Sequence, residues 1–239
     1  MPAVTAQRVL ESLEAVRDPE LDEPITSLGF VASCIVSAGG TATVRLRLPT
    51  YFCAPNFAFL MVADAYDAVS SVDGVRSAEI VLEDHFASSA INDGVAARAG
   101  FVGTFTGEAV SELYELRAAF LRKAVMAGTD IVCRPLLAAG TTADELLAMV
   151  LGDVPGSDSL DRLRRRRAEL GLPSADSDPL VIDPVTGLPV AAEALPLHLR
   201  RARVTRTGIE ANTSICSGML QFRYSGVESG VSGVKEEVR

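Results

Sequence analysis

The sequence predicts an α/β (α+β) fold: a small mixed-sheet domain with the order helix, strand, strand, helix, strand, followed by a mostly helical C-terminal region. Two observations lead to this prediction. Apolar residues up to residue 83 switch between helical and strand spacing, whereas the later apolar patterns are nearly all helical. The chain of 239 residues is 48% hydrophobic and 22% charged, which is typical of a folded protein with a real core.

Each element of the first domain has its own local signal. Apolar residues recur at helical spacing after Thr5, which can cap the helix, and Pro19 stops it. Gly39 and Gly40 mark a hairpin turn between a stretch rich in β-branched residues and a stretch of polar–apolar alternation. These signals predict helices over 5–16 and 56–70 and strands over 30–37, 41–48 and 75–82.

Beyond residue 83 the character of the sequence changes to helical. Thr142 and Glu145 have the spacing of a capping box, which predicts a helix start at that point. The other helical patterns cover 85–99, 107–127, 159–170 and 193–203. We therefore predict three parts: an α/β domain over 1–100, a helical region over 101–224 and a flexible tail over 225–239.

Net charge argues against a nucleic-acid partner. The chain has a formal charge of −9 and a pI near 4.8, so it repels phosphate backbones. The basic run of Arg162 and 164–167 alternates with leucines, and we expect it to be a solvated helix face. No apolar stretch reaches the roughly 18 residues of a membrane span, and the first residues lack a signal-peptide pattern. We therefore expect a cytoplasmic protein without a membrane partner.

The four cysteines are the main candidates for chemistry. None belongs to a C-x-x-C pair, and in a reducing cytoplasm they are expected to be free thiols, metal ligands or nucleophiles. Cys53 lies between a strand end and a helix start, where the helix dipole favours a thiolate, and Thr50 supplies a hydroxyl on the same loop. The alternative for Cys53 is a small buried hydrophobic residue, as we expect for Cys34 and Cys133.

Four further residues are candidates for metal binding or its support. Cys216, in a stretch of small polar residues, is a candidate second sulfur donor. His85 follows two acidic residues at the end of the third predicted strand, where it is either an iron ligand or a solvated loop histidine. Asp18 and Glu20 flank a rigid proline, so they form either a metal-binding pair or a simple acidic turn.

Four segments follow one another in an order that resembles a known family. They are Asp18-Pro19-Glu20, Ser27-Leu28-Gly29-Phe30-Val31, Leu48-Pro49-Thr50 leading to Cys53, and Val72-Asp73-Gly74-Val75. This order is similar to that of the SufT/PaaD-like (MIP-type) iron–sulfur cluster assembly family. The resemblance covers about residues 5–83, and it carries the family's cysteine over to Cys53 and its acidic motif to Asp18 and Glu20. The chain departs from the family pattern because Ala54 separates the cysteine from Pro55 and two aromatic residues precede it.

The resemblance implies a non-enzymatic factor that assembles iron–sulfur clusters or matures the metal site of an oxygenase. The implied cofactor is a transiently held iron–sulfur cluster or iron, and the implied partner is a client metalloprotein such as a diiron monooxygenase. One cysteine per chain suits a cluster shared across a homodimer. The alternatives are a cysteine-dependent enzyme and a non-catalytic scaffold of an oxygenase complex. We predict three metal ligands and three supporting residues: Cys53, Cys216 and His85, supported by Asp18, Glu20 and Thr50.

Overall fold

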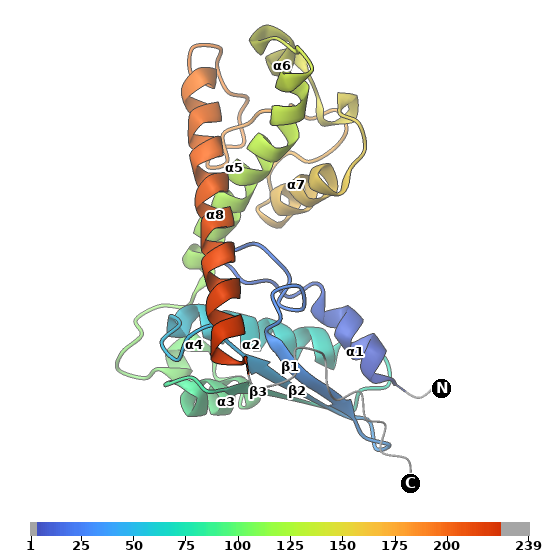
Figure 1. Ribbon diagram of the computed structural model, residues 1–239, viewed down its shortest axis with the longest axis vertical. Helices are drawn as coiled ribbons and strands as arrows, with labels where there is room; N and C mark the ends of the chain where they lie inside the picture. The colour runs from blue at the N-terminus through green and yellow to red at the C-terminus, as the bar shows by residue number, and fades with distance from the viewer. Residues whose placement is uncertain (1–3, 226–239) are drawn as a thin grey trace. The chain divides into compact units, whose positions relative to one another are not determined.

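The computed structural model describes residues 4–225, and the chain forms two compact units. The first unit combines the residues up to Leu113 with those from Asn212 onward, and the second is Tyr114–Ala211. The long helix α8 (Leu195–Arg223) contributes residues to both units (Figure 1). The domain boundary that the sequence predicts near residue 100 falls at the start of a short helix inside the first unit. The end of the functional domain at this residue stays a prediction.

The first unit has the predicted helix-strand-strand-helix-strand order, with two short helices added after the third strand. Its three strands lie in the order β1-β2-β3. The pair β1 and β2 is antiparallel and the pair β2 and β3 is parallel, so the sheet is mixed, as predicted. The elements are α1 (Ala6–Leu13), β1 (Val31–Val36), β2 (Thr41–Arg47), α2 (Pro55–Ser70), β3 (Ser77–Glu83), α3 (Ser88–Ala96) and α4 (Gly100–Thr104).

The core of the first unit forms against one side of the sheet. Along β2, Ala42, Val44 and Leu46 are buried, which confirms the predicted alternation. Figure 1 shows α1 and α2 side by side over the sheet, and α2 buries most of its apolar residues there. The loop between β2 and α2 is therefore anchored at both ends by buried elements.

The last turns of α8 complete the core of the first unit. Gly29, just before β1, has a φ of +74°, a conformation that favours glycine, and a Cβ at that position would lie 3.4 Å from the Leu220 side chain. Leu220 is buried in the same core as the sheet. The sequence pattern predicted this helix only to residue 203, because the Thr, Gly and Ser residues that follow have low helix propensity, which packing overrides.

The second unit consists of helices joined by loops, as predicted for this part of the chain. It has a hydrophobic core of its own, to which α5 and α7 contribute buried residues. The predicted capping box is present, because the Thr142 hydroxyl accepts the Glu145 N–H and the Glu145 carboxylate accepts the Thr142 N–H. The elements are α5 (Tyr114–Ala138), α6 (Ala143–Ala148), the 3-10 helix η1 (Leu151–Asp153), α7 (Asp158–Glu169) and the first part of α8.

Two arginines of the basic run are buried, which corrects the prediction of a solvated face. Arg166 is 5% exposed and Arg167 is 0% exposed. Arg167 Nη1 donates to the backbone carbonyl of Pro179 at 2.9 Å, and its Nη2 donates to that of Leu180. Burial lowers the pKa of Arg167 to about 10, so the guanidinium still carries its charge at neutral pH. The sequence pattern misses this because the two carbonyls come from a loop that is distant along the chain.

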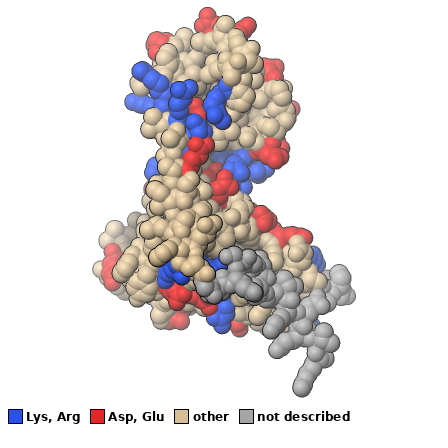
Figure 2. Space-filling model, in the orientation of Figure 1, with Lys and Arg blue, Asp and Glu red and all other residues tan. Residues whose placement is uncertain are grey.

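Charged side chains cover both units. Figure 2 shows acidic side chains over both units and basic side chains gathered mainly over the second. None of the described helices is long and apolar enough to cross a membrane. The predicted flexible tail, 225–239, lies outside the described residues apart from Ser225. The expected absence of a nucleic-acid partner stays a prediction.

Candidate functional site

Cys53 lies in the loop between β2 and α2, which we call the cysteine loop (48–54). Its side chain is partly buried against the core of the first unit. The Thr50 hydroxyl oxygen lies 3.3 Å from Cys53 Sγ and accepts a hydrogen bond from the Phe52 N–H at 3.3 Å. The hydroxyl and the thiol are within hydrogen-bond distance, and either group can be the donor. The structure thus places the predicted hydroxyl directly beside the predicted sulfur.

His85 holds the main chain of Cys53 in place. The imidazole is 3% exposed, its Nε2 lies 2.7 Å from the Cys53 carbonyl oxygen, and the Ala87 N–H donates to its Nδ1 at 3.2 Å. Because Nδ1 accepts the Ala87 N–H, Nε2 carries the hydrogen that is donated to the Cys53 carbonyl. Both ring nitrogens are engaged by backbone groups. A ligand role for His85 therefore stays a prediction, and it requires one of these two hydrogen bonds to break.

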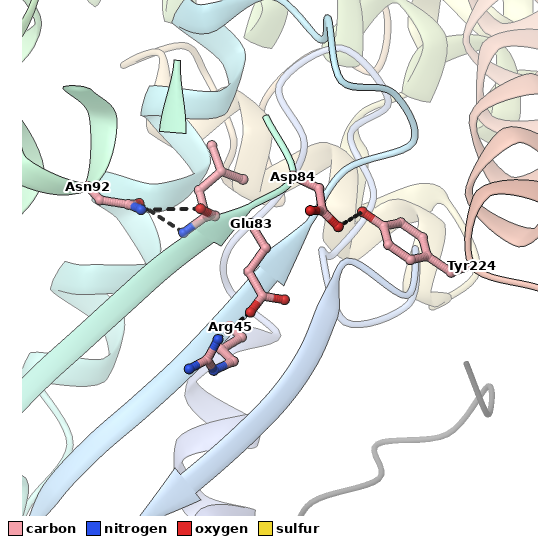
Figure 3. Close-up of polar contacts among 6 residues, drawn as sticks. Arg45, Glu83, Asp84, Asn92 and Tyr224 are labelled. Carbon is pink, nitrogen blue, oxygen red and sulfur yellow. Dashed lines mark hydrogen bonds and ion pairs between the residues drawn. The ribbon is translucent and has the colours of Figure 1, made fainter. Parts of the chain in front are cut away.

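Side-chain contacts fix the end of β3, from which the histidine loop (84–87) departs (Figure 3). The Asn92 side chain accepts the Leu82 N–H at 2.8 Å and donates to the Leu82 carbonyl at 3.2 Å. Arg45 on β2 forms an ion pair with Glu83 on β3. The Phe86 N–H, further along the histidine loop, donates to a carbonyl of the cysteine loop at 3.2 Å. The two loops are therefore held to the sheet and to each other.

The C-terminal end of α8 binds the first residue of each loop. Arg223 donates to the backbone carbonyl of Leu48 at 3.1 Å and to that of Asp84. The Tyr224 hydroxyl donates to the Asp84 carboxylate at 3.3 Å (Figure 3). The sequence analysis missed Arg223 and Tyr224, because their partners, two backbone carbonyls and the Asp84 carboxylate, lie far away along the chain. Residues at the end of α8 thus belong to the structure that supports Cys53.

Asp18 and Glu20 form a turn with a clear structural role. Asp18 is buried, and its Oδ1 accepts the N–H groups of Glu20 and Leu21, both at 2.8 Å. Burial raises the pKa of the Asp18 carboxyl against the effect of these two N–H groups, and the negative charge of Glu20 adds to the rise. Glu20 Oε1 accepts the side-chain amide of Asn212 on α8 at 3.3 Å. A metal-supporting role for the two acids stays a prediction.

Cys216 lies on α8, one turn after Asn212, in the same neighbourhood as Cys53. Both sulfurs pack against the core of the first unit. Burial raises the pKa of the Cys216 thiol, and the negative charges of Asp18, Cys53 and Glu20 raise it further. All six predicted site residues belong to the first unit. Thr50 and His85 contact Cys53 directly, and Glu20 contacts α8 one turn before Cys216.

Cys34 and Cys133 are fully buried free thiols, as expected for core residues. Burial raises the pKa of Cys34 to about 11 and that of Cys133 to about 12. At neutral pH both sulfurs are therefore protonated and shielded from reagents.

Comparison with known proteins identifies the first part of the chain. Residues 6–81, from α1 to β3, match the family model described as iron-sulfur cluster assembly protein. The uncharacterized protein MJ1129 of Methanocaldococcus jannaschii is 30% identical over 90 residues, which are 38% of this chain and 93% of that protein. This chain belongs to the iron–sulfur cluster assembly protein family. No solved structure gives a significant match.

The matched residues 6–81, which we call the assembly domain, contain only part of the predicted site. Cys53, with its neighbour Thr50, lies inside the assembly domain. His85 and Cys216 lie beyond it, although both belong to the same compact unit. The part of the chain after residue 81 has no family assignment. This member of the iron–sulfur cluster assembly protein family therefore supports its cysteine loop with residues that the family match does not include.

Three aromatic side chains of the two loops lie exposed beside Cys53. Tyr51 is 47% exposed, Phe52 76% and Phe86 49%. The ring centres of Tyr51 and Phe52 are 4.9 Å apart, and Phe86 lies 6.3 Å and 6.0 Å from them. Two of these rings are the aromatic residues by which the chain departs from the family pattern. Together the three rings form an exposed apolar surface on the cysteine loop and the histidine loop.

The donor set suits iron, but not in a closed metal site. Thiolates are the ligands of iron–sulfur clusters, and the partly exposed Cys53 offers one. Within residues 4–225, no group of three or more His, Cys, Asp or Glu side chains is placed to hold a metal ion.

Proposed function

We propose that the protein assembles or delivers iron–sulfur clusters in the cytoplasm, with Cys53 as a transient ligand of the cluster or of iron. Family membership supports the iron–sulfur role. The observation that carries the proposal is the position of Cys53: a partly exposed thiol on a loop held by buried contacts, with the Thr50 hydroxyl 3.3 Å from its sulfur. A single accessible thiol with a fixed main chain can bind its cargo without enclosing it.

In this proposal each residue of the loop has one task. Cys53 Sγ loses its proton and binds the cluster or iron. The Thr50 hydroxyl donates to the thiolate while the ligand is absent. His85 Nε2–H keeps the Cys53 carbonyl, and so the whole loop, in position. Release is a ligand exchange in which a donor of the acceptor protein replaces Cys53 Sγ, so no redox step is required.

The acceptor in this proposal is a client metalloprotein, and a diiron monooxygenase is the specific client to test. The exposed rings of Tyr51, Phe52 and Phe86 support delivery through protein contact, because they offer an apolar surface next to the sulfur. We further propose that two copies can share one cluster through their Cys53 residues.

The cysteine-dependent enzyme receives less support than the assembly role. A catalytic cysteine needs a base within hydrogen-bond reach of its sulfur. His85 contacts the Cys53 carbonyl rather than Sγ, and both of its nitrogens are occupied by backbone groups.

Anaerobic reconstitution with iron and sulfide tests the proposal. We expect visible cluster absorbance in the wild-type protein, near-complete loss of it in Cys53→Ala, and no change in Cys133→Ala, whose sulfur is fully buried in the second unit. An unchanged spectrum in Cys53→Ala would overturn the assignment. Gel filtration tests the shared cluster, because loaded protein then elutes as a larger species than metal-free protein, and identical elution contradicts sharing.

A further inference from the structure

We infer that a cavity of the first unit binds a small organic monocarboxylate with an apolar body, and that Arg47 binds its charge. The cavity has a volume of about 620 Å³, which lies in the range of pockets that hold small molecules. Its lining residues come from α1, the segment before β1, the ends of the strands β1 and β2, and the last turns of α8, all within the first unit. We call this cavity the arginine pocket.

The arginine pocket is separate from the candidate iron–sulfur site. Among the described residues that line it, none is one of the six predicted site residues. The wall contributed by α8 lies outside the family match, which ends at residue 81. The inference therefore goes beyond the proposed function and does not depend on cluster binding by Cys53.

Arg47, at the end of β2, is a cationic residue of the pocket without an anionic partner. Its Nε is buried and has no hydrogen-bond partner in the described part of the chain. Glu83, its register partner on β3, forms its ion pair with Arg45 instead. A half-buried guanidinium without an acceptor costs free energy, and a bound carboxylate offsets this cost by accepting two N–H groups at once.

The guanidinium of Arg47 is held in place by contacts of its own. Its carbon atom lies 4.6 Å from the centre of the Tyr224 ring, over which it stacks. The Tyr224 hydroxyl donates to the Asp84 carboxylate at 3.3 Å (Figure 3), and the backbone N–H of Arg47 donates to the Phe30 carbonyl at 2.8 Å. A cation that is already fixed binds an anion at a lower entropic cost than a mobile one.

The other walls of the pocket suit an apolar body with a polar head. Leu28, Val31 and Leu220 are buried and line the pocket. Apolar walls of this kind bind hydrocarbon groups that leave water. Thr26, a further lining residue, has a buried hydroxyl oxygen without a hydrogen-bond partner among the described residues. The pocket thus combines a cation, an unpartnered hydroxyl and an apolar wall.

Acidic side chains of α1 limit the charge of the ligand. Glu11 and Glu14 line the same pocket and are exposed, and the Gln7 side chain donates to Glu11 at 3.1 Å. Two negative charges on this side repel a second anionic group on the ligand. The pocket therefore fits a monocarboxylate better than a dicarboxylate.

Calorimetric titration of the full-length protein with hexanoate, octanoate and decanoate tests the pocket. We expect one ligand per chain and an affinity that rises several-fold with each longer chain, because more hydrocarbon is buried. Octanamide, the uncharged match of octanoate, and octanedioate, with a second carboxylate, should each bind roughly tenfold more weakly than octanoate. Equal affinities for octanoate and octanamide would overturn the inference, as would the absence of saturable binding of all three carboxylates.

Substitution of the arginine tests which residue binds the charge. Arg47→Gln should weaken octanoate binding roughly tenfold and leave octanamide binding unchanged, whereas Arg47→Lys should lose less. The matched control is Arg8→Gln, which removes one positive charge from an exposed position of α1 outside the pocket and should bind octanoate as wild type does. Wild-type octanoate affinity in Arg47→Gln, or an equal loss in Arg8→Gln, contradicts the assignment of Arg47.

A pair of variants that leaves Arg47 in place tests the location. Ser217 is a half-buried residue of α8 that lines the pocket, so Ser217→Phe adds a ring there and should abolish the binding of octanoate and octanamide alike. Met219→Phe adds a ring at an exposed position of the same helix outside the pocket and should bind both ligands as wild type does. Urea unfolding checks that each variant keeps its fold. Normal octanoate binding by folded Ser217→Phe would place the ligand elsewhere and overturn the inference.

Discussion

Each unit of the protein buries a nitrogen-containing side chain that binds the main chain, but the two side chains serve different ends. His85 in the first unit binds backbone groups on either side, and one of them is the carbonyl of Cys53. Arg167 in the second unit donates to the carbonyls of Pro179 and Leu180. The first arrangement fixes a loop that carries a reactive group to the surface. The second fixes a loop over the unit's own core.

The two partly exposed cysteines both belong to the first unit, which also buries Cys34 in its core. Cys53 and Cys216 are partly exposed, whereas Cys133 is fully buried in the core of the second unit. The partly exposed sulfurs therefore belong to the first unit, and the second unit uses its cysteine for packing. The comparison teaches that a buried hydrogen bond to the main chain does not by itself indicate a functional site. What matters is whether the segment that it holds carries a reactive side chain, as the loop of Cys53 does. Three substitutions test this difference.

Removal of the buried guanidinium in the second unit should have the largest effect. Arg167→Met leaves the Pro179 and Leu180 carbonyls without their donors in a buried position, and we expect a loss of about 3 kcal/mol in the stability of this unit. Hydrogen exchange along α5 and α7 measures the loss unit by unit. The control is Arg165→Met, on the same helix but exposed, which should change stability by less than about 0.5 kcal/mol.

The same variant tests whether the two units are independent in function. We expect Arg167→Met to keep wild-type cluster loading under conditions where it remains folded. Loss of loading in the folded variant would break the comparison, because the second unit would then contribute to the chemistry.

Removal of the buried imidazole in the first unit should have a smaller effect on stability. His85→Ala frees the Cys53 carbonyl and the Ala87 N–H, and we expect a loss of about 2 kcal/mol with faster amide exchange in the cysteine loop. His198→Ala, which removes a buried histidine of the second unit, should leave that exchange unchanged. We expect loaded His85→Ala to show the wild-type absorbance bands at lower occupancy. Shifted bands would instead assign His85 as a ligand.

Removal of the hydroxyl beside the sulfur should have the smallest effect. Thr50→Val keeps the side-chain shape but leaves a Cys53 thiolate without the donor at 3.3 Å. We expect a stability change below about 1 kcal/mol and a few-fold slower alkylation of Cys53 at neutral pH. Thr50→Ser retains the hydroxyl and should alkylate at the wild-type rate. Equal rates in all three proteins would show that the hydroxyl does not act on the sulfur.

The fold of the assembly domain could be predicted from the sequence because its signals are local. The alternation of Ala42, Val44 and Leu46 and the glycines of the hairpin each determine nearby backbone structure. Cys53 and Thr50 were also found from local position, between a strand end and a helix start. For these residues the neighbouring sequence is enough to predict the local structure and the position of the side chain in it.

The supporting contacts could not be predicted because they join distant segments through the backbone. Arg223 binds the carbonyl of Leu48, and Arg167 binds the carbonyl of Leu180. Every residue has the same backbone carbonyl, whatever its side chain. No pattern of residue types therefore marks which carbonyl is the acceptor. The buried role of His85 was missed for the same reason, since its partners are also backbone groups.

The discontinuity of the first unit has a consequence for its biosynthesis. The matched residues end at 81, but Leu220 of its core and the Arg223 that holds its loops are synthesised only after the whole second unit. At typical translation rates this delay is on the order of ten seconds. A nascent or prematurely terminated chain thus carries Cys53 on a loop without its contact with Arg223. The proposed function therefore predicts that the chain holds its cargo fully only after α8 has been synthesised.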